Sequence, residues 1–166
     1  MLFRSPEGSL AQSLQLAARV VVAGFGTRLV HVEYGGFDTH ATQAPAHDAL
    51  LRQLDRALDA LLSELDAHGA LDRCVVLVHS EFGRRVAENR SQGTDHGAAA
   101  PVFLFGGKGL RPGLHGQVPE LDDLDDGDLR CTIDFRRVYA ELCGVVGVDA
   151  ERVLGAQFER VGLFGA

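Results

Sequence analysis

Three short segments carry acidic and imidazole side chains whose types and spacing suit metal chemistry. Asp38 and His40 are separated by one residue, Glu81 stands in the second segment, and Asp95 is followed directly by His96. Imidazole nitrogens and carboxylate oxygens are the ligands of catalytic Zn²⁺ and Mn²⁺, and carboxylate-rich sites accept harder ions such as Ca²⁺. The pattern predicts a divalent-metal site built from these five residues.

Each of these motifs also has an ordinary structural explanation when it is taken alone. Asp-x-His and Asp-His arise often by chance, and most isolated cases cap a helix or bond the nearby backbone. Their presence in three segments is what favours a site. Arg84, which follows Glu81 closely, leaves two alternatives open. It binds an anionic group bidentately, or it forms a structural pair with Glu81 or with the acidic segment 120–128.

Two other sequence motifs resemble known functional sites but lack residues that those sites require. A nucleophile elbow at Ser80 would need glycine where Val78 and Phe82 stand. The acidic run around Leu124 fails as a calcium loop, because Leu124 and Ile133 occupy its third and twelfth ligand positions. We interpret this run as a solvated loop that favours the positive N-terminus of the following helix.

The elements that must position these residues alternate between helices and strands. The predicted elements are helices over 9–23, 48–69 and 133–142 and strands over 28–34, 74–79 and 101–105. The segment 81–98 is predicted to be a polar loop. The candidate ligands follow the first two strands or precede the third, and strand ends are where α/β sheets place ligand sites. We therefore predict an α/β layered domain with a mostly buried sheet.

Length and charge narrow the class of protein further. The 166 residues are enough for a single domain over 1–166 with a real core. The net charge of −7 disfavours nucleic acid and anionic membranes as partners. The three cysteines give neither a disulfide framework nor a thiolate cluster. We find no membrane span and no targeting signal in the sequence.

The same motifs resemble the bacterial family called domain of unknown function 1501. The segments that carry the resemblance are 35–40, 80–84, 93–97, 126–129 and 134–136, in the order of the family and across nearly the whole chain. That family is grouped with the alkaline phosphatase and sulfatase superfamily, whose members are α/β sandwiches with a two-metal site. The resemblance therefore implies an alkaline phosphatase-like sandwich, divalent metal ions and a small anionic ester as substrate.

The resemblance also implies roles for individual residues. Asp38, His40 and His96 correspond to ligands of one metal, and Glu81 stands where the superfamily has an aspartate on the second metal. In a different assignment, Asp95 and His96 form the second-metal pair. Two departures are visible: the first pair is spaced more closely than in the superfamily, and a phenylalanine follows Glu81 where a histidine is usual.

Only the carboxy-terminal part of the family is resembled. Its amino-terminal half would supply the nucleophile, another metal carboxylate and often a twin-arginine export signal. We therefore expect a metal-binding, phosphatase/sulfatase-like domain of hydrolase ancestry that is inactive or incomplete alone. Its sheet would be covered by the missing amino-terminal half or by a homo-oligomer. The alternative is a non-catalytic, truncated or degenerate domain that acts as an interaction module.

Overall fold

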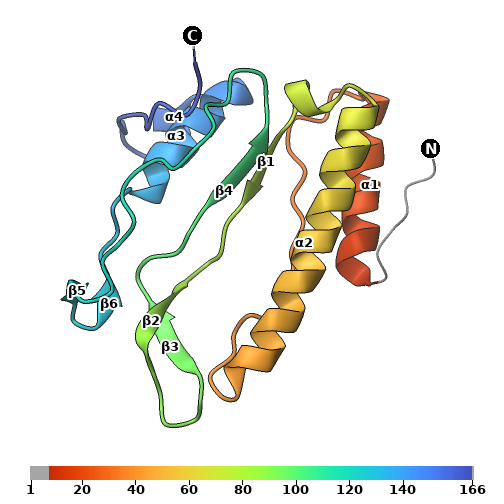
Figure 1. Cartoon of the computed structure of the whole chain (residues 1–166). Coiled ribbons are helices and arrows are strands. Elements are labelled where there is room, and N and C mark those ends of the chain that lie inside the picture. Colours follow the sequence, from red (N-terminus) through yellow and green to blue (C-terminus); the bar gives the residue numbers. More distant parts are fainter. Residues whose placement is uncertain (1–7, 166) are drawn as a thin grey trace.

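Two long helices form the main core of the protein. The computed structural model describes residues 8–165, in which α1 (Ser9–Ala23) and α2 (Gln43–Ala67) lie side by side (Figure 1). Their facing sides carry apolar residues at helical spacing. The buried cluster consists of Leu10, Leu14, Ala18, Ala57, Leu61, Leu65 and Ala70. The sequence predicted α1 with Ser9 as its N-cap, whereas Gly8 is the N-cap and Ser9 is the first helical residue. It predicted the type of α2 but not its start.

The early start of α2 has a tertiary cause. The backbone N–H groups of Thr42 and Gln43 donate to the carbonyls of Ser91 and Gln92, both at 2.9 Å. Free N–H groups at a helix N-terminus need partners from elsewhere, and here a distant hairpin supplies them. The helix therefore begins at Gln43 rather than near Asp48.

Six short strands pair into three antiparallel two-stranded sheets within residues 8–165. The pairs are β1 (Val75–Val78) with β4 (Phe103–Gly106), β2 (Gly83–Glu88) with β3 (Thr94–Gly97), and β5 (Leu124–Asp125) with β6 (Asp128–Leu129). The chain is thus mixed α/β. The run that forms β1 is half-buried along its length rather than fully buried, because its only strand neighbour in this part of the chain is β4.

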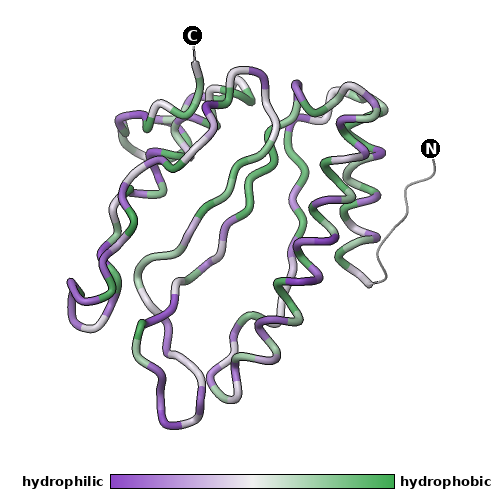
Figure 2. The backbone as a smooth tube through the Cα atoms, in the orientation of Figure 1, coloured by the Kyte–Doolittle hydropathy of each residue, from purple (hydrophilic) through white to green (hydrophobic). Residues whose placement is uncertain are grey.

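The prediction of a polar loop over 81–98 was wrong, because β2 and β3 form a hairpin there. Figure 2 shows why the hydrophobic pattern did not predict this hairpin: β1 and β4 are hydrophobic, whereas the hairpin is largely hydrophilic. Glycine also weakens the strand signal in both strands at the open end of the pair. Gly83 lies opposite Gly97, and a Cβ on Gly97 would lie 2.6 Å from the backbone carbon of Arg84. Close backbone packing therefore requires residues that sequence patterns associate with turns.

Residues 28–34, predicted to be a strand, are extended but unpaired. Val32 and Tyr34 pack against the helical core, while His31 and Glu33 are exposed, so the expected alternation is present. The backbone of this segment makes no hydrogen bond to the rest of residues 8–165. Within residues 8–165, the segment is therefore not a strand of any sheet.

The C-terminal part of the chain docks on a third helix. A 3-10 turn, η1 (Leu71–Arg73), precedes β1, and α3 (Phe135–Val145) and α4 (Ala150–Leu154) follow the strands. Asp134 caps α3 by accepting from the N–H of Arg136 at 2.9 Å. The carboxylate of Glu141, buried on α3, accepts from three consecutive backbone N–H groups of residues 162–164.

The acidic run near residue 124, predicted to be a solvated loop, is mostly exposed and forms a short hairpin. It contains the β5–β6 hairpin, and Arg130 pairs with Asp123 at 3.0 Å and with Asp125 at 3.7 Å. Among the described residues, no helix has the length and apolar character needed to cross a membrane.

Candidate metal centre

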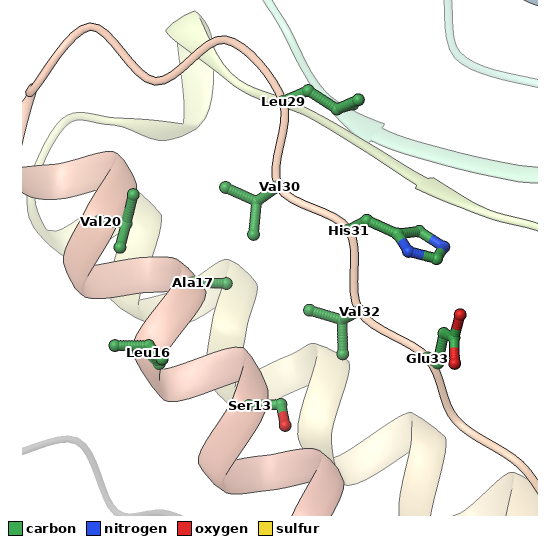
Figure 3. A pocket seen from close by; sticks show the side chains of 9 residues that line it. All are labelled: Ser13, Leu16, Ala17, Val20, Leu29, Val30, His31, Val32 and Glu33. Atoms are coloured by element: carbon green, nitrogen blue, oxygen red, sulfur yellow. The ribbon is translucent and has the colours of Figure 1, made fainter.

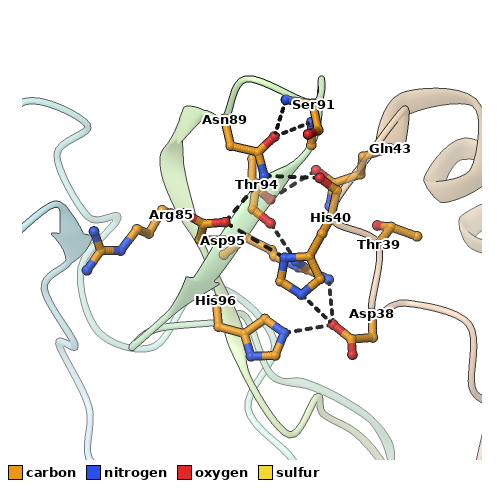
Figure 4. A network of polar contacts seen from close by, with 12 residues as sticks. Asp38, Thr39, His40, Gln43, Arg85, Asn89, Ser91, Thr94, Asp95 and His96 are labelled. Carbon is orange, nitrogen blue, oxygen red and sulfur yellow. Dashed lines mark hydrogen bonds and ion pairs between the residues drawn. The ribbon is translucent and has the colours of Figure 1, made fainter.

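Asp38, His40 and His96 meet in one exposed cluster. Oδ1 of Asp38 lies 2.9 Å from Nε2 of His40 and 2.7 Å from Nε2 of His96. The two imidazole rings lie 4.9 Å apart, and Figure 4 shows both directed at the same carboxylate. About half of each imidazole side chain is exposed, so the cluster is open to solvent. Three potential ligand atoms therefore converge on one point.

Different elements deliver the three side chains. Asp38 and His40 lie in the connection between the extended segment and α2, and His96 lies in β3, 58 residues further along the chain. The connection turns sharply into α2 at Thr42, which has a φ of +46°. The β2–β3 hairpin bonds the start of α2, and this contact brings His96 to Asp38.

Hydrogen bonds dominate the electrostatics of the cluster. The pKa of Asp38 is lowered from its ordinary value, chiefly by the hydrogen bond from His96 and further by the one from His40. Arg84 adds a guanidinium nitrogen 3.7 Å from Oδ1 of Asp38. All these contacts favour the carboxylate form, which is the form that binds a cation.

Phe82 and Arg84 support His96 from one side. The ring of Phe82 is stacked on the imidazole of His96, with centroids 3.9 Å apart and planes inclined by 10°. The guanidinium of Arg84 lies 5.0 Å from the centroid of the Phe82 ring. It also donates to the carbonyls of Thr94, at 2.7 Å, and Phe37, at 2.5 Å. Arg84 thus ties the hairpin to the segment that carries Asp38, while anion binding by Arg84 stays a prediction.

The two remaining predicted ligands lie outside the cluster. Asp95 directs Oδ1 toward Nδ1 of His40, at 3.8 Å, and accepts from Nδ2 of Asn89 at 3.3 Å. Neighbouring residues of a strand direct their side chains to opposite faces, so Asp95 does not accompany His96 to Asp38. Glu81 is exposed in the loop after β1 and does not belong to the ligand cluster found among residues 8–165.

Sequence reasoning missed the residues that hold this arrangement together. Asn89 donates to the carbonyl of His40 at 3.0 Å, and Thr94 donates to Oε1 of Gln43 at 2.9 Å. The spacing of Asn89 and Gly93 is a usable turn signal, because an asparagine side chain readily bonds the backbone of a following turn. Gln43 carried no signal, since its partner is distant in sequence.

The donor set fits a small divalent cation that accepts nitrogen. Two imidazoles and one carboxylate match the three protein ligands of catalytic zinc sites. With bonds of about 2.0 Å, ligand atoms around tetrahedral zinc lie about 3.3 Å apart. The present separations of 2.7 and 2.9 Å would therefore widen by about half an ångström on binding. Exposed side chains on short segments can make such a shift.

Comparison with known proteins assigns the family. The family described as "Protein of unknown function (DUF1501)" has a model that matches residues 4–161, so the chain belongs to this family. No curated protein and no solved structure matched the chain.

Proposed function

We propose that this chain is a metal-binding domain in which Asp38, His40 and His96 bind one divalent cation. The single observation that carries the proposal is the approach of two Nε2 atoms, from distant parts of the chain, to one carboxylate oxygen. Two imidazole ligands favour Zn²⁺ or Mn²⁺ over Ca²⁺, which prefers oxygen ligands.

The same donor set supports a role in ester hydrolysis by proteins of this type. Three protein ligands leave at least one coordination position for water or substrate, as in catalytic zinc sites. A bound cation supplies Lewis acidity toward a phosphoryl or sulfuryl oxygen. We propose on this basis, and on the resemblance of the motifs, an alkaline phosphatase-like layered sandwich of hydrolase ancestry. Its substrate would be a small anionic ester. The separation of Glu81 and Asp95 from the cluster supports the assignment with Asp38, His40 and His96 on one metal.

Isothermal titration with Zn²⁺ tests the metal site. The purified chain, freed of metal with a chelator, is compared with a variant that carries Asp38→Ala and His40→Ala. His31→Ala is the matched control, because His31 is an exposed histidine outside the cluster. We expect one equivalent of Zn²⁺ to bind the wild type and His31→Ala, and none to bind the double variant. Equal binding by all three proteins, or by none, would contradict the proposal.

An interaction module is the second candidate, and the unpaired segment favours it. A groove of about 360 Å³ runs between α1 and residues 29–33, and its walls include Leu16, Val20 and Val30 (Figure 3). Leu29, which also lines the groove, is 79% exposed. An extended backbone with free N–H and C=O groups is a template for a further strand. A second copy of the chain fits here, because antiparallel pairing centred on His31 places Val30 of one copy opposite Val32 of the other.

Light scattering behind size-exclusion chromatography tests this second candidate. A dimer is expected for the wild type, and Val30→Pro, which cannot donate to a ladder, should be monomeric. Because Val30 lies outside the ligand cluster, zinc binding should be the same in both. A monomeric wild type at all concentrations would contradict pairing of copies.

A further inference from the structure

The tip of the β2–β3 hairpin is closed by one asparagine. The backbone N–H of Asn89 donates to the carbonyl of Gly93 at 2.8 Å, which closes the turn. Its side-chain Oδ1 accepts from the N–H groups of Ser91 and Gly93, at 2.9 and 3.1 Å. The tip is therefore a turn held by hydrogen bonds to both the backbone and the side chain of Asn89, rather than a free loop.

This tip is clamped onto the segment that carries His40. Ser91 and Gln92 accept from the first N–H groups of α2, and Nδ2 of Asn89 donates to the carbonyl of His40 at 3.0 Å. Gly93 is buried directly against the backbone of His40, and a Cβ there would lie 2.8 Å from the backbone nitrogen of Ala41. The position of the His40 backbone is thus set by the hairpin.

The same Asn89 amide also holds Asp95, so His40 lies between two carboxylates. Nδ2 of Asn89 lies 3.3 Å from Oδ1 of Asp95, and that oxygen lies 3.8 Å from Nδ1 of His40. The other ring nitrogen, Nε2, contacts Asp38. The contacts are visible together in Figure 4. At 3.8 Å, Nδ1 of His40 and Oδ1 of Asp95 are at ion-pair distance. A rotation of the His40 ring that moves Nδ1 by less than one ångström would bring the two atoms within hydrogen-bonding distance.

We propose that Asp95 is a positioning residue for His40 and not a metal ligand. Held by Asn89, it accepts the Nδ1–H of His40, fixes the tautomer of the ring and directs Nε2 at the cation. Imidazole ligands in metal sites commonly donate their second N–H to a carboxylate in this way. The inference rests on the proposed metal site. It gives Asp95 a role different from that of a ligand, and it assigns the hairpin tip a function in the site.

Two readouts on Asp95→Ala and Asp95→Asn test the proposal. The first is the ¹⁵N chemical shift of the His40 ring in metal-free protein, which reports the tautomer. It is measured in an Asp38→Ala background, because Oδ1 of Asp38 otherwise accepts the Nε2–H of His40 at 2.9 Å. In that background we expect the Nδ1–H form with Asp95 present, a mixture with Asp95→Ala, and restoration with Asp95→Asn, whose amide oxygen still accepts. Tautomers that are identical in all three proteins would overturn the proposal. This measurement needs no metal, so it stands apart from any failure of the metal site itself.

The second readout is metal binding, with Co²⁺ as a spectroscopic probe and Zn²⁺ for affinity. Loss of an orienting carboxylate lowers metal affinity by about 10- to 100-fold and leaves the ligand set intact. We therefore expect Asp95→Ala to bind Co²⁺ with the visible spectrum of the wild type and Zn²⁺ at that reduced affinity, with partial recovery in Asp95→Asn. A Co²⁺ spectrum that loses a ligand, or a loss of binding equal to that of Asp38→Ala, would make Asp95 a ligand and overturn the proposal. Unchanged affinity would overturn it as well.

Discussion

Replacement of Gly93 by alanine should separate the tip of the β2–β3 hairpin from the segment that carries His40. The added Cβ would lie 2.8 Å from the nitrogen of Ala41, whereas ordinary contacts begin at 3.4 Å. Because the carbonyl carbon and oxygen of His40 lie even nearer to this Cβ, the tip must withdraw by more than about 0.6 Å. The 2.9 Å bonds from Thr42 and Gln43 would then lengthen beyond about 3.5 Å, the limit of hydrogen bonding.

The loss of folding stability can be estimated from the hydrogen bonds that break. Two backbone hydrogen bonds, each contributing about 1 kcal/mol, give a destabilisation of about 2 kcal/mol. Because His40 and His96 are joined through this contact, zinc affinity should fall in the same variant. Urea unfolding followed by circular dichroism measures the first effect, and zinc titration measures the second.

Gly35→Ala is the matched control for this prediction. Gly35 lies in the same connection, its φ is not positive, and a Cβ there meets nothing within 4 Å. It should unfold at the wild-type urea concentration and bind zinc as the wild type does. The reasoning is refuted if Gly93→Ala is as stable as Gly35→Ala, or if it loses stability while its zinc affinity is unchanged.

Three further predictions concern side chains around and beyond the site. Glu141→Ala removes the acceptor of three backbone N–H groups, one of them buried, and should lower the free energy of unfolding by about 3 kcal/mol in urea titrations. Glu141→Gln keeps an acceptor oxygen and should lose less. The pKa of Asp134 is lowered to about 2, chiefly by its side-chain hydrogen bond with Arg136. Because the folded pKa is the lower one, the contribution to stability is present above the ordinary value of 3.8 and is lost as the pH falls toward 2. The stability curves of the wild type and Asp134→Ala should therefore converge between these two pH values. Phe82→Leu removes the ring stacked on His96 and should weaken zinc binding by about 3- to 10-fold, which titration measures.

Each of these three predictions has a clear contrary result. A Glu141→Ala variant as stable as Glu141→Gln would show that the carboxylate does not hold the C-terminal segment. Parallel pH curves for wild type and Asp134→Ala would remove the role assigned to the pair with Arg136. Unchanged zinc affinity in Phe82→Leu would show that the stacked ring does not orient His96.

The helices were predictable because their signals are local. Apolar spacing and a terminal glycine define α1 without reference to any other element, and the same holds for the capped start of α3 at Asp134. Pairing of strands is not local. Residues 28–34 show the alternation of a strand, yet they make no ladder with any part of the chain that the structure describes, because a ladder needs a neighbour that the sequence of the segment does not specify.

The types of residue in the site were predictable from the sequence, but which of the five candidates belong to it was only partly predictable. Asp38 and His40 are two residues apart, so their proximity is almost guaranteed by the chain. The position of His96 beside Asp38 depends on a polar hairpin that has no apolar pattern in its sequence. Glu81 and Asp95 were indistinguishable from ligands in the sequence, because only the positions of β1 and β3 decide which way such side chains point.

The most direct measurement of the central claim is a crystal structure of the zinc-soaked protein with anomalous diffraction recorded at the zinc edge. The proposal predicts one anomalous peak at about 2.0–2.2 Å from Oδ1 of Asp38 and from Nε2 of both His40 and His96. Asp95 should then lie within hydrogen-bonding distance of Nδ1 of His40. A peak bound by Asp95 or Glu81 in place of these ligands, or no peak at the cluster, would contradict the assignment.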